Sequence, residues 1–223
     1  MIILYHCMNA RSFRALWALE ELRLPYELKI LPFPPRVHAR DYLQVNPLGT
    51  IPLMLDGETR MTESAAICQY LATRYGPSPL GVQPNESAYG AFLNLLHFGE
   101  ATLTFPQAVV LRYSRLEPPE RRQPQVAEDY ARWFYGRLRA VEAIVSQSEY
   151  VCAGRFTAAD ISVGYALMLA DYLGLAGRFT PAVAAYWNRL RERSAFTRAL
   201  AAQDAAARAQ GVSAVPAPLA AGG

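Results

Sequence analysis

The segment from Asn46 to Pro52, of sequence NPLGTIP, constrains this chain more than any other, together with the pair Glu63-Ser64 that follows it. Pro52 comes after an apolar residue at the mouth of a predicted strand, which makes the Ile51–Pro52 bond a candidate cis peptide. A cis bond here would leave the N–H and C=O of Ile51 unpaired and facing outward, where an extended peptide can add as one more strand. Glu63-Ser64 opens a predicted helix, whose first N–H groups and positive dipole end favour a carboxylate. Together these features predict a site for a short peptide that carries a carboxylate.

Four further motifs occur along the chain, and they carry a family resemblance. They are LYH at 4–6, RALWALEEL at 14–22, ESAAICQYL at 63–71 and FTAADI at 156–161. With these motifs the chain resembles the cytosolic glutathione transferases, in particular the Ser/Asn-type bacterial and fungal members. The resemblance extends from residue 2 to about residue 207. It implies that a cis-proline loop and a Glu-Ser pair hold the tripeptide glutathione.

Residues 1–76 alternate between strand and helix patterns. Strand patterns occur at 2–5 and 26–31 and in a hairpin at 52–61, where Asp56-Gly57 predicts a turn with positive φ at both positions. Helical patterns occur at 11–24, 38–45 and 63–75. The order βαβαββα is that of a thioredoxin-like domain, with a mixed sheet and helices on both faces. We therefore predict an α/β domain over residues 1–76.

The remainder of the chain is predicted to be all-helical. Pro and Gly residues break the pattern after residue 76, so that 77–84 is expected to be a linker and 85–210 a helical domain. Within it Thr157 and Asp160 have the spacing of a capping box, and Thr180 is placed to cap a helix that begins with Pro181. Residues 211–223 are rich in Ala, Pro, Gly and Ser, and are expected to form a flexible tail. One apolar helical face is traced by Tyr130, Phe134, Leu138, Val141 and Val145.

Bulk composition narrows the classes of partner. At 223 residues and 52% hydrophobic content the chain can bury a substantial core. The net charge is only +3 and the basic residues are scattered, so we expect no nucleic-acid partner. No secretory leader is visible at the N-terminus, and the longest apolar run, 161–170, is too short to span a bilayer, so we expect no membrane association. Three cysteines without ligand-like spacing predict neither disulfides nor a metal site, and favour a cytoplasmic location.

The resemblance assigns roles at the peptide end of the site. It implies that Ser64 donates from its hydroxyl and its N–H to the γ-glutamyl carboxylate, while Glu63 meets the ammonium group directly or through water. The glycyl carboxylate is expected to meet a basic side chain that follows the second strand. His38 is the predicted residue, with Arg36 and Arg40 as alternatives.

The sequence identifies the group that activates the thiol less clearly than it identifies the residues that bind the peptide. In the family it comes from the loop after the first strand, which is residues 6–12 here. The position at which related bacterial and fungal members carry Ser or Thr is Ala10, and a methyl group cannot donate a hydrogen bond. Asn9 therefore leads the candidates, since its amide is next to that position. The alternatives are the hydroxyl of Ser12, the guanidinium of Arg11 and the thiol of Cys7.

The resemblance predicts a detoxifying glutathione S-transferase that conjugates the thiolate of glutathione, as co-substrate, to small apolar electrophiles. The electrophile is expected to lie against the long helical stretch after residue 85, where Phe105 and Tyr113 are the predicted acceptor-site residues. A homodimer is implied as well. Two alternatives stay open, namely glutathione-dependent reduction of peroxides or disulfides, which Cys7 would favour, and a glutathione-binding module with little turnover, which Ala10 would favour.

Overall fold

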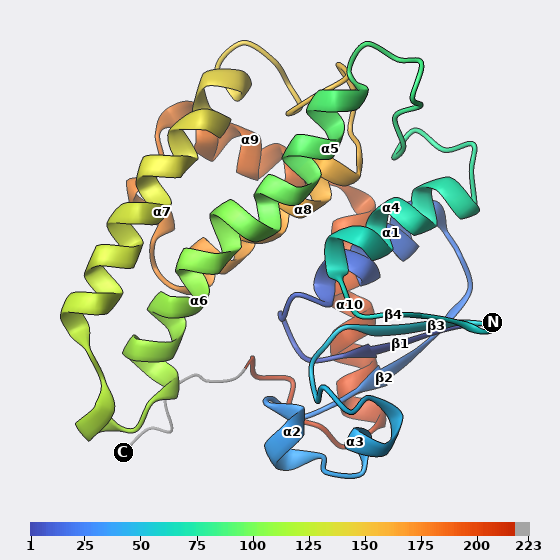
Figure 1. The fold of residues 1–223 in the computed structure, drawn as a ribbon, viewed down its shortest axis with the longest axis vertical. Coiled ribbons are helices and arrows are strands. Elements are labelled where there is room, and N and C mark those ends of the chain that lie inside the picture. Colours follow the sequence, from blue (N-terminus) through green and yellow to red (C-terminus); the bar gives the residue numbers. More distant parts are fainter. Residues whose placement is uncertain (217–223) are drawn as a thin grey trace. The chain divides into compact units, whose positions relative to one another are not determined.

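The computed structural model describes residues 1–216 of the 223 in the chain. These residues form two compact units (Figure 1). The first unit comprises residues 1–76 together with residues 193–216, and the second comprises Pro77–Glu192. Of the predicted tail, residues 217–223 lie outside the described part of the chain.

A four-stranded mixed sheet forms the centre of the first unit, with strand order β2-β1-β3-β4. Strand β1 (Ile2–His6) pairs in parallel with β2 (Tyr26–Ile30), whereas β3 (Leu53–Asp56) is antiparallel both to β1 and to β4 (Thr59–Met61). The buried side chains of β1 and β3 are apolar except for His6, the last residue of β1. The predicted thioredoxin-like fold class is confirmed.

The hairpin between β3 and β4 differs from its prediction in the position of the turn. Asp56 pairs with Thr59, so the two central residues are Gly57 and Glu58 rather than Asp56 and Gly57. Only Gly57 has a positive φ, at 57°. A glycine at the first central position needs one left-handed residue instead of two. Asp56 is therefore free to stay in the strand, where its carboxylate accepts hydrogen bonds from two tyrosine hydroxyls on and just after the helix that follows β4.

Within residues 1–216, five helices belong to the first unit. Helix α1 (Phe13–Leu22) contacts both α4 (Ser64–Arg74) and α10 (Ser194–Ala209). Two short helices, α2 (Pro35–His38) and α3 (Tyr42–Val45), follow β2. The pattern at 38–45 predicted one short helix, and the chain instead makes two short helices.

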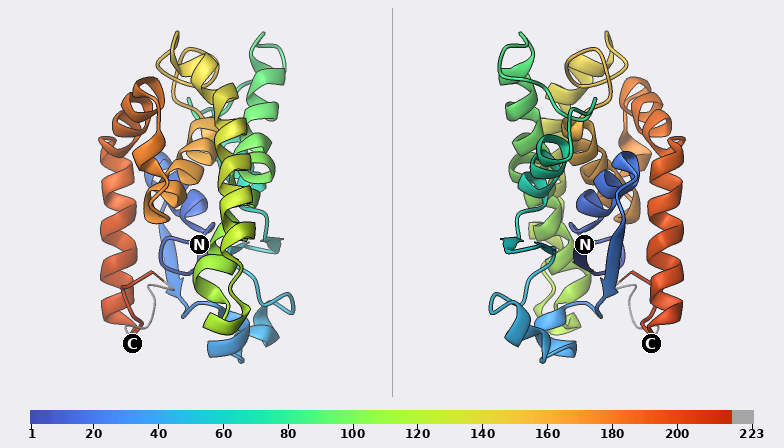
Figure 2. Two further views of the ribbon diagram at one scale, coloured as in Figure 1. Left: turned by 90° about the vertical axis from the view of Figure 1, so that its left-hand side faces the viewer. Right: turned by 90° about the vertical axis from the view of Figure 1, so that its right-hand side faces the viewer.

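Helix α10 packs on the first unit, although the sequence pattern had grouped 85–210 in one helical domain. It contacts α1 and β2 and lies beside them in Figures 1 and 2. Phe196 packs edge-on against Trp17, with ring centroids 4.9 Å apart. Arg193 forms a bidentate ion pair with Glu21, in which Nε donates to Oε1 at 2.6 Å and Nη2 donates to Oε2 at 2.9 Å. Bidentate pairs of this kind fix orientation as well as contributing energy, which explains why α10 docks here.

The chain immediately after α10 is also packed. Val212 donates its N–H to the carbonyl of Ala207 at 2.9 Å, and its side chain lies against a small core formed by Met8, Ile30 and Ala207. The first residues of the predicted tail therefore belong to the first unit in the structure.

The second unit is helical. Its longest helix, α7 (Pro124–Val145), buries Phe134, Leu138 and Val141, which are three members of the predicted apolar face. Helix α8 (Ala158–Tyr172) is buried over almost its whole length. The other elements are α5 (Tyr89–His97), the π-helical turns η1 (Phe98–Thr104) and η2 (Arg112–Leu116), α6 (Phe105–Leu111), the short 3-10 turns η3 (Pro119–Arg121) and η4 (Ala176–Arg178), and α9 (Pro181–Arg191).

Of the two helix caps predicted in this unit, the one at Thr157 is formed and the one at Thr180 is not. The Thr157 hydroxyl accepts from the N–H of Ala159, and the Asp160 carboxylate accepts from the N–H of Thr157 at 2.8 Å, so the capping box is formed. Thr180 precedes the first residue of α9 as predicted, but its side chain makes no capping hydrogen bond. Its buried hydroxyl has no hydrogen-bond partner within residues 1–216.

Close helix packing in this unit depends on one glycine. A Cβ on Gly99 would lie 2.4 Å from the hydroxyl oxygen of Ser162 on α8, so only glycine lets η1 approach this closely. The Ser162 hydroxyl in turn donates to the carbonyl of Leu96 at 2.6 Å. None of the helices within residues 1–216 is both long and apolar enough to cross a membrane.

Candidate functional site

The register of the sheet brings the predicted site segments to one end of the first unit. Tyr5 pairs with Leu53, so the loop after β1 lies at the same end as the Ile51–Pro52 bond that precedes β3. Met54 pairs with Met61, so the chain leaves β4 at this end too and begins α4 there. His6 pairs with Ile30, which adds the segment that leads to α2. The loop at 7–12, the 51–52 peptide, the start of α4 and α2 are thereby gathered at one end of the sheet.

The Ile51–Pro52 bond is cis, as predicted. The turn before it is held by Asn46 and Tyr42, whose Nδ2 and hydroxyl both donate to the carbonyl of Thr50, at 2.9 and 2.8 Å. Asn46 Oδ1 also accepts from the N–H of Leu48 at 3.2 Å. Within residues 1–216 the N–H and C=O of Ile51 have no hydrogen-bond partner. A backbone edge of this kind can pair with an extended peptide.

Gly49 fixes the approach of this turn to α2 and α3. Its φ is +60°, and a Cβ would lie 2.8 Å from Cβ of Arg36 and 2.9 Å from Cδ2 of Leu43. The close contact places α2 directly against the turn. His38 is the last residue of α2 and is exposed, as are Arg36 and Arg40 nearby. The three basic candidates belong to one segment, in which Arg36 packs against Gly49.

The start of α4 has the features of a carboxylate site. Glu63 is the residue before the helix, with an extended backbone, and makes no capping hydrogen bond with its side chain, which is exposed. Ser64 is the first helical residue and is 3% exposed. Its hydroxyl oxygen accepts from Nη1 of Arg14 at 3.2 Å, which leaves the O–H available to donate.

Arg14 is a residue that sequence reasoning missed as part of the site. It lies on α1, is fully buried, and is the largest charged side chain in the core. Its Nη1 donates to the hydroxyl of Ser64, so Arg14 connects α1 to the start of α4, where the helix dipole is positive. The signal in the sequence was a charged residue in the otherwise apolar run FRALWAL.

In the loop after β1, Asn9 occupies the left-handed region with φ of 53°. Asn tolerates this conformation better than most residues because its short polar side chain can bond locally. Here its Oδ1 accepts from Nε2 of Gln203 at 2.7 Å, and its own N–H donates to Oε1 of Gln203 at 3.2 Å. The side chain is half-buried. Since the oxygen is held by Gln203, Nδ2 is the donor end of the Asn9 amide.

The other candidates in this loop differ in exposure. Ser12 is fully buried and its hydroxyl lies 2.7 Å from Nδ1 of His6, so it points into the core and does not cap α1. Cys7 is fully buried too, with its thiol 3.8 Å from the carbonyl oxygen of Pro32. Burial raises the pKa of Cys7 to about 12, which keeps the thiol protonated. Arg11 is half-buried beside Ala10.

His6 links this loop to the core. It is fully buried, and burial lowers its pKa to about 4, so the imidazole is neutral at physiological pH. Nε2 lies 2.9 Å from Oε1 of Gln203. Neither His6 nor Gln203 was identified from the sequence, because the two lie far apart along the chain and each has an unremarkable local context.

Comparison with known proteins identifies the family. The model for "Glutathione S-transferase, N-terminal domain" matches residues 4–79. Glutathione S-transferase 4 of Zea mays is 30% identical over 190 residues, which cover 82% of this chain and 83% of the maize protein. The chain belongs to the glutathione S-transferase family. The predicted family membership is confirmed, and so is the prediction that the chain is an enzyme of this family.

Two further relatives show how far the likeness extends. Glutathione S-transferase 3 of Schizosaccharomyces pombe is 39% identical over 106 residues, which span only 43% of that protein's length and 46% of this chain. The crystal structure of glutathione transferase URE2P6 from Phanerochaete chrysosporium, in complex with oxidized glutathione, is 27% identical. It has a TM-score of 0.79 and covers 90% of this chain and 95% of the fungal one.

In this glutathione S-transferase the predicted acceptor residues lie in the second unit. Phe105 begins α6 and is 50% exposed, with its ring edge-on to Tyr130 at a centroid distance of 6.3 Å. Tyr113 lies in η2 and is half-buried, with the Arg112 guanidinium 5.6 Å from its ring centroid. Both residues belong to one helical stretch that π-helical turns interrupt, and such turns often occur at functional sites.

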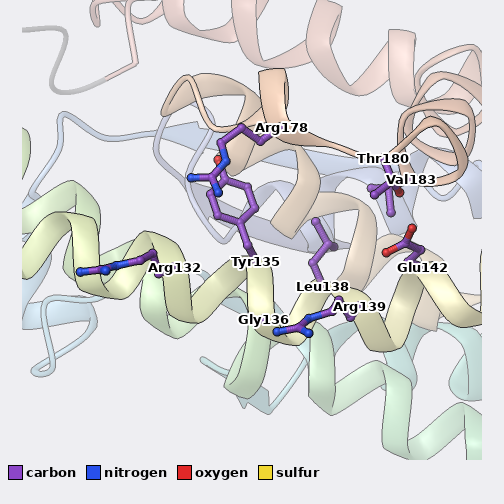
Figure 3. A pocket seen from close by; sticks show the side chains of 9 residues that line it. All are labelled: Arg132, Tyr135, Gly136, Leu138, Arg139, Glu142, Arg178, Thr180 and Val183. Carbon is purple, nitrogen blue, oxygen red and sulfur yellow. The ribbon is translucent and has the colours of Figure 1, made fainter.

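The second unit also has a groove of about 390 Å³, shown in Figure 3, which contains no predicted site residue. Its walls come from α7 and from the segment around Thr180. Arg178 lies over the ring of Tyr135 at 4.3 Å, and Arg132 pairs with Asp129 at 2.5 Å. Because Glu142 faces the same groove, the lining has no single charge character. No group of three or more metal-ligating side chains occurs within residues 1–216.

Proposed function

We propose that this glutathione S-transferase conjugates the thiolate of glutathione to small apolar electrophiles. The observation that carries the proposal is the meeting, at one end of the sheet, of an unpaired backbone edge at Ile51, an uncapped helix start at Ser64 and an amide donor at Asn9. Glutathione has two carboxylates, an ammonium group and a thiol. Each of these groups has a partner of matching chemistry at this end of the first unit.

Binding of the peptide portion follows from these partners. Ile51 supplies the N–H and C=O that pair with the cysteinyl backbone, with Pro52 closing the turn. The hydroxyl and N–H of Ser64 donate to the γ-glutamyl carboxylate, and the buried Arg14 holds the oxygen of that hydroxyl. Glu63 is exposed and meets the ammonium group. His38 meets the glycyl carboxylate from α2.

We assign thiol activation to Asn9. A thiol has an ordinary pKa of about 8.5, and lowering it by about 2 units requires about 2.7 kcal/mol of differential stabilisation. One hydrogen bond to a charged group contributes about 1.5–3 kcal/mol, and the start of α1 adds about 0.3–1 kcal/mol. A single donor of the Asn9 type is therefore sufficient. Arg11 is the second candidate, whereas the buried hydroxyl of Ser12 is already engaged with His6.

Conjugation is favoured over glutathione-dependent reduction by the state of Cys7. Mixed-disulfide chemistry needs an accessible thiolate. Cys7 has no exposed surface, and burial raises its pKa to about 12. Its position therefore supports a packing role. We further propose that Phe105 and Tyr113 form part of the wall for the electrophile, and that the enzyme acts in detoxification as a cytoplasmic homodimer, as the family resemblance implies.

The proposal is tested by conjugation of 1-chloro-2,4-dinitrobenzene. Asn9→Asp keeps the oxygen that Gln203 holds but replaces the Nδ2 donor with a second oxygen. Loss of one hydrogen bond to a thiolate is expected to lower kcat/KM by about 10- to 100-fold. Asn94→Asp, the same change on the exposed face of α5, is the matched control and should leave the rate unchanged. An unchanged rate in Asn9→Asp would overturn the assignment, and absence of conjugation by the unaltered protein would overturn the activity.

A further inference from the structure

The side chain of Gln203 on α10 connects three separate parts of the first unit. Its Oε1 lies 2.9 Å from Nε2 of His6 and accepts from the N–H of Asn9 at 3.2 Å. Its Nε2 donates to Oδ1 of Asn9 at 2.7 Å. The side chain is 2% exposed. Gln203 is thus a buried amide, in a helix rich in alanine, whose hydrogen bonds all go to the end of β1 and to the loop that carries Asn9.

The hydrogen-bond directions in this cluster are set by chemistry. A glutamine carbonyl oxygen can only accept, so Nε2 of the neutral His6 carries the ring proton and Nδ1 is an acceptor. The Ser12 hydroxyl therefore donates to Nδ1 across 2.7 Å. The Ser12 oxygen in turn accepts from the N–H of Cys7 at 3.4 Å. The cluster thus joins the end of β1, the start of α1 and the middle of α10.

We propose that Gln203 is a positioning residue that orients the Asn9 amide toward the thiol of glutathione. This inference rests on the proposed function, in which Asn9 stabilises the thiolate. Only some rotamers of the Asn9 side chain present Nδ2 to the ligand. Gln203 forms hydrogen bonds with both the backbone N–H and the side-chain oxygen of Asn9. These two bonds set the direction of Nδ2 before glutathione binds. Such preorganisation removes part of the ordering cost from the activation step.

The cluster also explains why His6 is buried in spite of its polarity. The His6 imidazole and the N–H of Asn9 both donate to Oε1 of Gln203, which restricts rotation of the amide. Buried polar groups that are fully satisfied rigidify their surroundings, whereas partly satisfied groups weaken them. Removing Gln203 should therefore affect Asn9 orientation more than peptide binding, which depends on Ile51 and Ser64.

The test measures the pKa of the glutathione thiol in the bound state by the ultraviolet absorbance of the thiolate. Gln203→Met keeps the length of the side chain and removes all three contacts. The expected result is a rise of about one unit in the thiol pKa, a tenfold change in acid dissociation. The Kd for glutathione should change less than twofold at about pH 5.5, where the bound thiol is protonated in both proteins. The rise should be absent when Gln203→Met is introduced into Asn9→Asp.

Gln210→Met is the matched control. Gln210 also docks the end of α10, because it accepts from the N–H of Ile30 at 2.9 Å and donates to the carbonyl of Leu28 at 2.7 Å, but it does not contact Asn9. A purely structural role for α10 predicts the same thiol pKa change in both variants. Positioning by Gln203 predicts a change in Gln203→Met alone, at comparable loss of thermal stability.

Gln203→Asn provides a second variant that keeps a buried amide and shortens it by one methylene group, and it should raise the thiol pKa in the same direction. An unchanged thiol pKa in folded Gln203→Met or Gln203→Asn, beside a raised one in Asn9→Asp, would overturn the positioning role and leave the proposed function intact. An unchanged thiol pKa in Asn9→Asp itself would instead overturn the assignment of Asn9.

Discussion

Gln203 and Asn9 are joined by two hydrogen bonds although 194 positions separate them in the chain. One bond holds the backbone N–H of Asn9 and the other holds its side-chain oxygen. The last helix of the protein therefore completes the loop that follows its first strand. Docking of α10 through Phe196 and through the Arg193–Glu21 ion pair supports the geometry of the proposed activating group.

Replacement of Ser64 tests the carboxylate site. Ser64→Ala removes a hydroxyl that would donate to a charged group, which is worth about 1.5–3 kcal/mol and corresponds to a Kd for glutathione weakened about 10- to 100-fold. Isothermal titration calorimetry measures this directly. Ser194→Ala is the matched control, because Ser194 also begins a helix and accepts from an arginine, Arg198, at 3.3 Å. Equal affinity of Ser64→Ala and the unaltered protein would show that the carboxylate binds elsewhere.

Replacement of Gly49 tests the packing of the binding turn. Gly49→Ala puts a side chain at a φ of +60° with its Cβ 2.8 Å from Cβ of Arg36. We expect a loss of about 1–3 kcal/mol in the free energy of unfolding and weaker glutathione binding, since the turn that presents Ile51 must shift. Gly90→Ala, in helix α5 with no atom within 4 Å of the new Cβ, should instead stabilise by about 0.5–1 kcal/mol. Urea denaturation of both variants gives the comparison.

The buried His6 predicts loss of stability in acid. Its pKa is lowered to about 4 in the folded protein, so the unfolded chain takes up the proton first as the pH falls. The contribution is fully present above pH 6.5 and declines by about 3 kcal/mol between about pH 6.5 and 4, at about 1.36 kcal/mol per unit. The measurement is the free energy of unfolding against pH for the unaltered protein and for His6→Gln. The difference between the two should shrink toward pH 4, and a difference independent of pH would contradict the prediction.

The contribution of Asp160 to the free energy of unfolding has the opposite pH dependence, and it is tested with a separate variant. Burial raises its pKa to about 6, so the folded protein holds this proton more tightly than the unfolded chain and stability declines as the pH rises from about 4 to 6. At pH 7 its carboxylate accepts from Val151, Thr157 and Tyr186.

In Asp160→Asn an NH₂ group must face one of those donors. We expect a loss of about 2–4 kcal/mol at pH 7. Thermal unfolding compares it with Asp129→Asn on the exposed face of α7, where the change should stay within about 0.5 kcal/mol. A loss in Asp160→Asn no larger than in this control would contradict the structural role of the capping box.

Local sequence chemistry was sufficient for much of the first unit and for one helix cap in the second. The alternation of apolar runs predicted its strands, Pro52 predicted the cis bond, and Thr157 with Asp160 predicted the capping box. Each of these features depends on residues a few positions apart. Helix α10 is different, because its apolar face is made largely of alanine and its partners on α1 lie more than 170 positions earlier, at Glu20 and Glu21.

At the site, the residue that activates the thiol could not be predicted from the sequence of the loop after β1. Each of the four candidates is a polar or reactive residue in the same loop: Asn9, Arg11, Ser12 and Cys7. Burial separates them in the structure, with Ser12 and Cys7 in the core and Asn9 and Arg11 half-buried. The contacts that Gln203 makes with His6 and Asn9 span nearly the whole chain, and periodicity and spacing do not reveal them.

The most direct test of the account is a pH titration of the thiolate absorbance of glutathione bound to the unaltered protein, with Asn9→Asp as the comparison. If Asn9 activates the thiol, the bound thiol pKa should lie about 2 units below the ordinary value of about 8.5. In Asn9→Asp it should return most of the way toward that value. A bound thiol that titrates near about 8.5 in the unaltered protein would contradict this activation.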